Sequence, residues 1–119
     1  MGFKFENLTV YHLSLDYLDI LYKLGKLLPR SEDFNLKSQM IRAGTSIVLN
    51  IAEGSTSCSN AEQIRYLKTS IRSLIETVAC QHLIQRREYV SSERDELKQA
   101  YSLSEHLFKK LQAFCRTLI

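Results

Sequence analysis

The sequence predicts an all-α fold, an antiparallel four-helix bundle with up-down-up-down topology. Apolar residues recur at spacings of three and four in four separate segments, and polar breaks of only a few residues separate these segments. Hydrophobic residues make up 45% of the 119 residues, whereas only four are glycine and one is proline, a composition that favours long helices around a packed core. We expect one domain over residues 1–119, with helices at roughly 9–28, 36–53, 60–86 and 93–118.

The first predicted helix carries two apolar stripes. Its main stripe consists of Val10, Leu13, Tyr17, Leu21, Leu24 and Leu28. A second stripe consists of Tyr11, Leu15, Leu18 and Tyr22. Pro29 ends the helix because proline lacks an amide donor and its ring clashes with the preceding turn. The second stripe indicates either a wide core face or a contact with another subunit, and we keep both interpretations.

The second predicted helix is bounded by a capping residue and a glycine. Asn35 is expected to cap its start, and Gly54 is expected to close it in the left-handed conformation. Its apolar face is expected to consist of Leu36, Met40, Ala43, Ile47 and Ile51. Gly44 in the middle of a helix costs about 0.5–1 kcal/mol relative to Ala, so we expect a neighbouring helix to pass close to it.

The last two predicted helices are defined by their first residues and by one apolar line each. A capping box of Ser59 and Glu62 starts the third helix. Its expected core line is Ile64, Leu67, Ile71, Leu74, Val78 and then His82 or Leu83. Ser92 starts the fourth helix, whose inward positions are Leu97, Tyr101, Leu107, Phe108, Leu111, Phe114 and Leu118. Glu105 and Lys109 are expected to pair across one turn of its exposed face.

Polar residues follow one another along the second helix at steps of three or four. They are Gln39, Arg42, Ser46, Asn50 and Glu53. Glu53 lies in the last turn, where the negative end of the helix dipole disfavours a carboxylate, so we expect a cation or backbone donors beside it. The favoured interpretation is a buried, hydrogen-bonded polar seam of Gln39, Ser46, Asn50 and Glu53 that selects one packing arrangement. A ligand site is the alternative.

The second helix also carries a family resemblance. The residues concerned are Gln39, 42–43, 46–47 and 50–54, with further matches at 66–67, 73–74 and Glu76. They resemble the four-helix bundle proteins encoded by intervening sequences within bacterial 23S ribosomal RNA genes, which are sometimes labelled ribosomal proteins. The chain departs from that pattern with Ile41 in place of Arg, Gly44 in place of Ala, Val48 in place of Pro and Arg72 in place of Gly. Relative to the family, one cation thus moves from the second helix to the third.

This resemblance implies a bundle that is not an enzyme and that assembles into a ring of five subunits. The chain is also distantly similar to the accessory proteins of diversity-generating retroelements. Those proteins are bundle pentamers that associate with nucleic acid and a reverse transcriptase.

Signals for catalysis and metal binding are absent from the sequence. It has no Glu-x-x-His pair of a di-iron site, no G-x-S-x-G turn, and its four scattered glycines do not form a phosphate loop. We expect His12 and Asp16 to be a solvated pair, His82 a hydrogen-bonded core histidine and His106 a surface residue. The sequence therefore predicts no enzyme, no metal, no cofactor and no small-molecule substrate.

The distribution of charge is compatible with RNA as a partner, and a solvated helix face explains the same charges at least as well. The formal net charge is +3 and the pI is about 8.8, values that tolerate a polyanion but fall well short of the dense basic tracts of a dedicated nucleic-acid binder. The candidate nucleic-acid contacts are Arg42, Arg65, Lys68, Arg72, Arg86, Arg87, Lys109 and Lys110. Repetition around a homopentamer would multiply weak contacts of this kind. The predicted function is a non-enzymatic, oligomeric, RNA-binding scaffold, and the alternative is a protein–protein interaction module with no nucleic-acid role.

Cysteine usage and hydropathy predict the compartment. No run of roughly 20 apolar residues could span a bilayer, and the first residues lack the apolar stretch of a signal peptide. The three cysteines, Cys58, Cys80 and Cys115, are odd in number and form no C-x-x-C pair, which is typical of a reducing compartment. We expect a cytoplasmic protein with no membrane partner.

Overall fold

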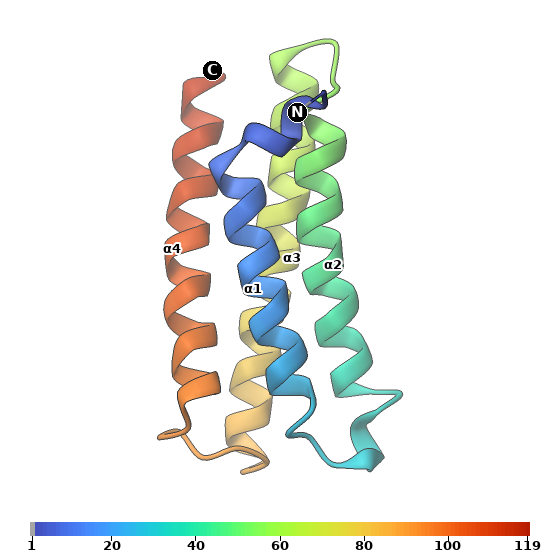
Figure 1. Ribbon diagram of the computed structural model, residues 1–119, viewed down its shortest axis with the longest axis vertical. Helices are drawn as coiled ribbons and strands as arrows, with labels where there is room; N and C mark the ends of the chain where they lie inside the picture. Colours follow the sequence, from blue (N-terminus) through green and yellow to red (C-terminus); the bar gives the residue numbers. More distant parts are fainter. Residues whose placement is uncertain (1) are drawn as a thin grey trace.

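Four long helices form an up-down-up-down bundle in the computed structural model, which describes residues 2–119 (Figure 1). The elements are η1 (Lys4–Asn7), α1 (Thr9–Gly25), η2 (Arg30–Glu32), α2 (Leu36–Gly54), α3 (Asn60–Arg86) and α4 (Asp95–Thr117). Each helix packs against the next and α4 packs against α1, so both termini lie at the same end of a molecule 44 Å long (Figure 1). The predicted all-α fold is confirmed, and residues 2–119 contain no strand. No helix in this part of the chain is both long and apolar enough to cross a membrane.

The helix bounds agree with the predicted ones to within three residues. The largest difference is at the end of α1, which stops at Gly25 rather than at Leu28. The chain continues there as a turn, in which Leu27 N donates to Leu24 O and Leu28 N donates to Gly25 O. Leu28 is buried although it lies in this turn, so its side chain extends the apolar stripe beyond the end of the helix.

The apolar faces predicted for α1 and α2 form much of the core. All residues of the main stripe of α1 are buried except Leu13, which is half-buried, and all five predicted positions of α2 are buried. The second stripe of α1 is half-buried, apart from Tyr22, which is exposed. Leu18 of this stripe packs over Gly44 of α2. The second stripe therefore contributes, in part, to the core.

The core face of α3 differs from the predicted one. The residues buried along it are Gln63, Leu67, Ser70, Leu74, Thr77, Cys80, Gln81 and Ile84. Ile64, Ile71 and Val78 of the predicted line are only half-buried. His82 is exposed, as is Leu83, so the prediction of a core histidine is wrong. The difference arises because polar side chains occupy part of the core, and a line drawn through apolar residues alone does not include them.

One predicted core residue of α4 also lies at the surface. Tyr101 is 46% exposed, while Ala100 and Ser104 face the core. Leu97, Leu107 and Leu111 are buried as predicted, and Phe108, Phe114 and Leu118 are half-buried. Glu105 and Lys109 are both exposed, and the predicted pair is not among the ion pairs formed within residues 2–119. The small residues Ala100 and Ser104 thus occupy the interior positions on either side of Tyr101.

The start of α2 is satisfied by a different group from the predicted one, whereas the start of α3 keeps one bond of its predicted capping box. Asn35 makes no capping hydrogen bond, and the Glu32 carboxylate accepts from Leu36 N at 3.2 Å and from Asn35 Nδ2 at 3.0 Å. A carboxylate suits this position because the start of a helix is the positive end of its dipole. At α3, Ser59 Oγ accepts from Glu62 N at 3.2 Å, which is one of the two bonds of the predicted capping box.

Both glycines of α2 lie where a neighbouring helix comes close. A Cβ on Gly44 would lie 2.7 Å from Leu21 Cδ1, and a Cβ on Gly54 would lie 2.8 Å from Tyr66 Cβ. The close approach predicted at Gly44 is therefore confirmed. The left-handed conformation predicted for Gly54 is wrong, because no glycine in residues 2–119 has a positive φ. The left-handed conformation occurs instead just after α3, at Glu88, where φ is 58°.

Candidate nucleic-acid interface

All eight basic residues predicted to contact nucleic acid are exposed. The ion pairs formed within residues 2–119 are Lys37–Asp33, Arg94–Glu96 and Lys98–Glu93. None of the eight candidates takes part in these pairs. Their charges are therefore available to phosphate groups rather than committed to carboxylates of the same chain.

Three of these cations share the outer face of α3. Arg65, Lys68 and Arg72 are spaced three and four residues apart, so they lie side by side along about two turns of the helix. We call this row the basic face. Burial raises the pKa of the Cys115 thiol of α4, and the positive charge of Lys68 opposes this shift, so Lys68 lies near α4. The basic face thus borders the C-terminal part of α4.

The remaining candidates are distributed over the bundle. Arg86 and Arg87 lie at the other end of α3, about 20 Å along its axis from Arg72 by the rise of an α-helix. Arg42 is exposed on α2. Lys109 and Lys110 lie in the C-terminal half of α4, which runs antiparallel to α3 and is at the same end of the bundle as the half of α3 that carries the basic face. The structure therefore groups five of the eight cations in one half of the bundle.

The polar seam of α2 is a hydrogen-bonded network at two of its four positions. Asn50 Nδ2 donates to Ser46 O at 2.8 Å and to Ser46 Oγ at 3.1 Å, and Ser73 Oγ of α3 donates to Ser46 Oγ at 2.9 Å. Gln39 and Glu53 are exposed instead, so the prediction that they belong to a buried network is wrong. They lie toward the two ends of the seam, where water solvates the amide and the carboxylate.

A second polar network, in the core, was not predicted. The Tyr17 hydroxyl lies 2.7 Å from Thr77 Oγ1 and 2.7 Å from Gln81 Nε2, and burial raises the pKa of Tyr17 to about 12. One signal in the sequence does point to it. Gln63, Ser70 and Thr77 recur at intervals of seven, as do Leu67, Leu74 and Gln81, which is the heptad pattern of a helix packed in a bundle. Core positions occupied by polar residues can be predicted only from the seven-residue spacing itself, because a search for apolar residues passes over them.

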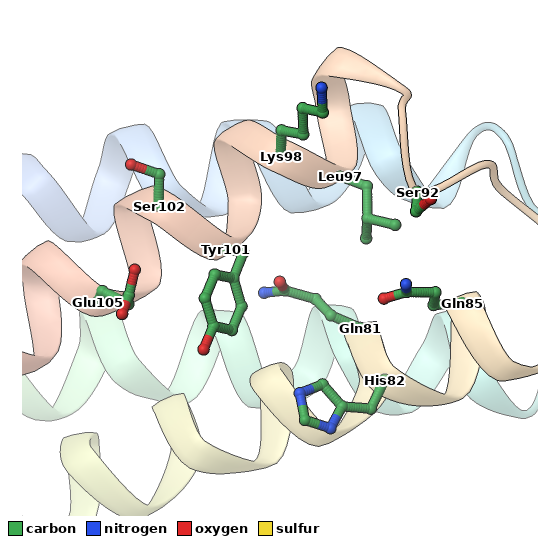
Figure 2. A pocket seen from close by; sticks show the side chains of 9 residues that line it. All are labelled: Gln81, His82, Gln85, Ser92, Leu97, Lys98, Tyr101, Ser102 and Glu105. Carbon is green, nitrogen blue, oxygen red and sulfur yellow. The ribbon is translucent and has the colours of Figure 1, made fainter.

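A groove of about 410 Å³ lies between α3 and α4 (Figure 2). Gln81, His82 and Gln85 line it from α3, and Leu97, Lys98 and Tyr101 line it from α4. Its walls combine amide groups with apolar surface. His82 and Gln85 also line a shallow depression beside Arg86, so the groove adjoins one of the predicted cations.

Fold and surface together define the class of protein: a small, basic helical bundle whose outer faces carry cations that form no ion pair within residues 2–119. The chain belongs to the 23S rRNA-intervening sequence protein family, which it matches over residues 6–113. The resemblance found in the second helix is therefore confirmed.

A solved structure supports the same assignment. The chain is similar to the crystal structure of a protein with unknown function from the S23 ribosomal protein family of Bacteroides thetaiotaomicron. The two share 28% sequence identity with a TM-score of 0.80, over 90% of this chain and 98% of that chain. No curated protein matches the sequence.

Proposed function

We propose that the protein is a non-enzymatic scaffold that assembles into a homo-oligomer and binds RNA through its basic face. The observation that carries the proposal is the row of Arg65, Lys68 and Arg72, which are exposed and unpaired within residues 2–119. Adjacent cations on one helix match the closely spaced phosphates of a nucleic-acid backbone. Membership of a family described by a ribosomal RNA intervening sequence adds support for RNA as the polyanion.

Assembly is supported by apolar side chains on the outer faces of α2 and α3. Leu49, Ile75 and Leu83 are each about half exposed, although they are large and aliphatic. We take these exposed aliphatic side chains as candidates for contact with a second subunit. In a ring, of five subunits by analogy with the family, each copy would add its own basic face, so that RNA affinity would rise by avidity.

The compartment proposed for this activity is the cytoplasm. The three cysteines are free thiols, and Cys58 is exposed. Exposed thiols persist in a reducing compartment, where RNA is also present.

The direct test measures binding of a structured RNA hairpin at a series of salt concentrations. The triple variant R65Q/K68Q/R72Q removes the basic face, and K23Q/K26Q/R30Q is its control, since it removes the same charge from exposed residues at the end of α1 and the start of η2. The plot of log affinity against log salt has a negative slope. We expect the first variant to make this slope shallower by about two to three, and the control to leave it nearly unchanged.

Two results would contradict the proposal. If wild-type protein fails to bind the hairpin at low salt, the RNA-binding proposal is wrong. The remaining hypothesis is then that the basic residues bind an acidic protein partner. If light scattering gives a monomer of 13.8 kDa, the oligomeric part is wrong. Equal loss of affinity in both triple variants would show that net charge matters and that the basic face does not.

A further inference from the structure

The groove between α3 and α4 contains a buried polar atom without a partner. Gln81 is 2% exposed, and its Oε1 accepts no hydrogen bond within residues 2–119. A buried carbonyl oxygen without a donor costs free energy, and most such atoms in proteins are satisfied. Gln81 lines the groove, and Figure 2 shows its amide between Tyr101 and Leu97. In this structure the oxygen is closed to solvent, so a donor approaching from the groove reaches it only when a lining side chain moves.

The orientation of this amide is determined by a chain of hydrogen bonds. Thr77 Oγ1 donates to Leu74 O at 2.6 Å and lies 2.7 Å from the Tyr17 hydroxyl, and we take the Tyr17 hydroxyl as the donor of this second bond. The Tyr17 oxygen then accepts from Gln81 Nε2, also at 2.7 Å. Turning the amide over would place Gln81 Oε1 against an oxygen that has no hydrogen left to donate. The core thus holds the amide nitrogen inward and leaves the oxygen as the acceptor.

The walls of the groove suit a flat ligand. Tyr101 is 46% exposed and its ring lies beside the Gln81 amide, while Leu97 points into the space between Gln81 and Gln85 (Figure 2). An aromatic ring and an aliphatic side chain offer a surface on which a planar ring can pack. A bare ammonium group would leave this surface uncovered, and the lining carries both a cation, Lys98, and a carboxylate, Glu105, so charge does not select the ligand.

We propose that the groove receives one unpaired RNA base whose exocyclic amino group donates to Gln81 Oε1. The ring of the base packs on Tyr101 and Leu97, and Arg86, beside the adjoining depression, contacts a neighbouring phosphate. This inference rests on the proposed RNA-binding function and adds base recognition to it, because contacts with phosphate do not distinguish one base from another. Adenine, cytosine and guanine carry the required amino group, whereas uracil does not.

The first experiment detects the base directly by NMR of ¹⁵N-labelled wild-type protein. Adenosine 5′-monophosphate is compared with purine riboside 5′-monophosphate, which lacks the amino group. We expect saturable shifts of the Gln81 side-chain amide and of the Tyr101 backbone amide with the first compound, and about tenfold weaker binding of the second. Equal binding of the two compounds, or no shift at Gln81, would overturn the inference.

The second experiment measures the affinity of an unstructured oligoadenylate for matched variants. Tyr101→Ala removes the ring from the groove, and Tyr22→Ala removes a tyrosine of similar exposure from α1. We expect about tenfold weaker binding for Tyr101→Ala and no change for Tyr22→Ala. Gln81→Met, which has nearly the same shape but no amide, should abolish the preference for adenosine 5′-monophosphate over the purine riboside compound.

The outcomes separate this inference from the proposed function. If both tyrosine variants bind RNA as the wild type does, with the same salt dependence, the groove proposal fails and the RNA-binding function stands. Shifts with adenosine 5′-monophosphate but no binding of any RNA would overturn the proposed function and, with it, RNA as the ligand. Shifts of the groove residues on dilution without nucleotide would show that a second copy of the chain covers the groove, which also overturns the inference.

Discussion

On the side of α3 that meets α2, small residues bring the two backbones together, whereas the side that meets α4 leaves a groove. Ser70 Oγ donates to Ile47 O of α2 at 2.9 Å, and Gly54 lies against Tyr66. On the other side, Tyr101 stands half exposed and Gln81 keeps an unpaired oxygen. The same helix therefore makes one contact whose hydroxyls are satisfied within the chain and another that leaves an acceptor open.

The difference indicates how polar residues of a bundle divide between packing and binding. Ser46, Ser70 and Ser73 find partners across the contact between α2 and α3, so that changing them should alter stability. Gln81 finds only one of its partners in the chain, so changing it should alter binding as well as stability. Whether a polar side chain is satisfied within the fold thus separates the two roles.

The largest effect is expected from Gly54→Ala, which disrupts the close contact between α2 and α3. The new Cβ would lie 2.8 Å from Tyr66 Cβ, an atom attached to the backbone of α3, so the two helices must move apart. We expect a loss of about 2 kcal/mol in the free energy of unfolding, measured by urea denaturation. Gly44→Ala is the control, because its Cβ would meet the mobile ends of Leu21 and Leu18 and alanine favours the helix, so its change should stay within about 1 kcal/mol. Equal losses in the two variants would contradict this account.

The next largest effect is expected from Tyr17→Phe, which removes the hydroxyl that accepts a hydrogen bond from the Gln81 amide. Without the hydroxyl, Gln81 Nε2 becomes a second unpartnered polar group in the core. We expect a loss of about 1–2 kcal/mol in the free energy of unfolding. The double variant Tyr17→Phe/Gln81→Leu should recover part of this loss, since it removes both the amide oxygen and the amide nitrogen of Gln81. A double-mutant cycle measures the coupling between the two residues. Strictly additive changes would show that the two residues do not depend on each other.

A smaller effect is expected from Ser70→Ala, also at the contact between α2 and α3. This change removes one bond from a buried hydroxyl to the backbone of α2, and Ile47 O keeps its position within its own helix. The expected loss in the free energy of unfolding is about 1 kcal/mol. Thr69→Ala serves as the control, because Thr69 is exposed and its hydroxyl donates only within α3, to Arg65 O. A control as destabilised as Ser70→Ala would assign the loss to α3 itself rather than to its contact with α2.

The smallest effect is expected at the end of the bundle, where neither side of α3 is involved. Tyr89 hydroxyl donates to Glu32 Oε2 at 2.7 Å, and this bond, followed by that from Leu36 N, lowers the pKa of the Glu32 carboxyl. A carboxyl whose pKa is lowered on folding stabilises the fold above its unfolded pKa, and this stabilisation is lost as the pH falls through its folded pKa. The melting temperature should therefore fall in acid.

Tyr89→Phe tests this assignment because it removes the donor and keeps the ring. The acid-dependent part of the melting temperature should become smaller in the variant, and Tyr11→Phe should leave it unchanged. The effect should be small, since the carboxylate is accessible to water, which screens it. An identical pH dependence in wild type and Tyr89→Phe would show that other carboxyls account for the loss of stability in acid.

Much of the bundle was predictable because the signals for it are local. Helical periodicity, the Ser59 cap and the interruption at Pro29 act within four residues of chain, and the elements agree with the prediction. Gly44 was recognised as a close contact from its position alone. The exposure of the eight candidate cations was predictable too, because an unpaired cation is costly to bury.

The candidate site was less predictable because its parts come from different helices. The seam was correct at Ser46 and Asn50, where α3 provides Ser73, and wrong at Gln39 and Glu53, where solvent is the partner. Tyr101 was assigned to the core because it is aromatic, yet it forms a wall of the groove. Periodicity ranks residues by hydropathy, and it does not say which neighbouring helix meets each one.

The sequence by itself determined four amphipathic helices, their order and lengths, the family and the cations on the surface. Each depends on residue identity and on spacings of a few residues. Only the tertiary structure decided that Gly54 serves helix contact, that Gln81 and Tyr17 meet in the core, and that a groove opens between α3 and α4. Gln81 and Tyr17 are 64 residues apart, so their hydrogen bond exists only once the helices have packed. That packing leaves Gln81 Oε1 without a hydrogen-bond partner within residues 2–119, which no local sequence pattern predicts.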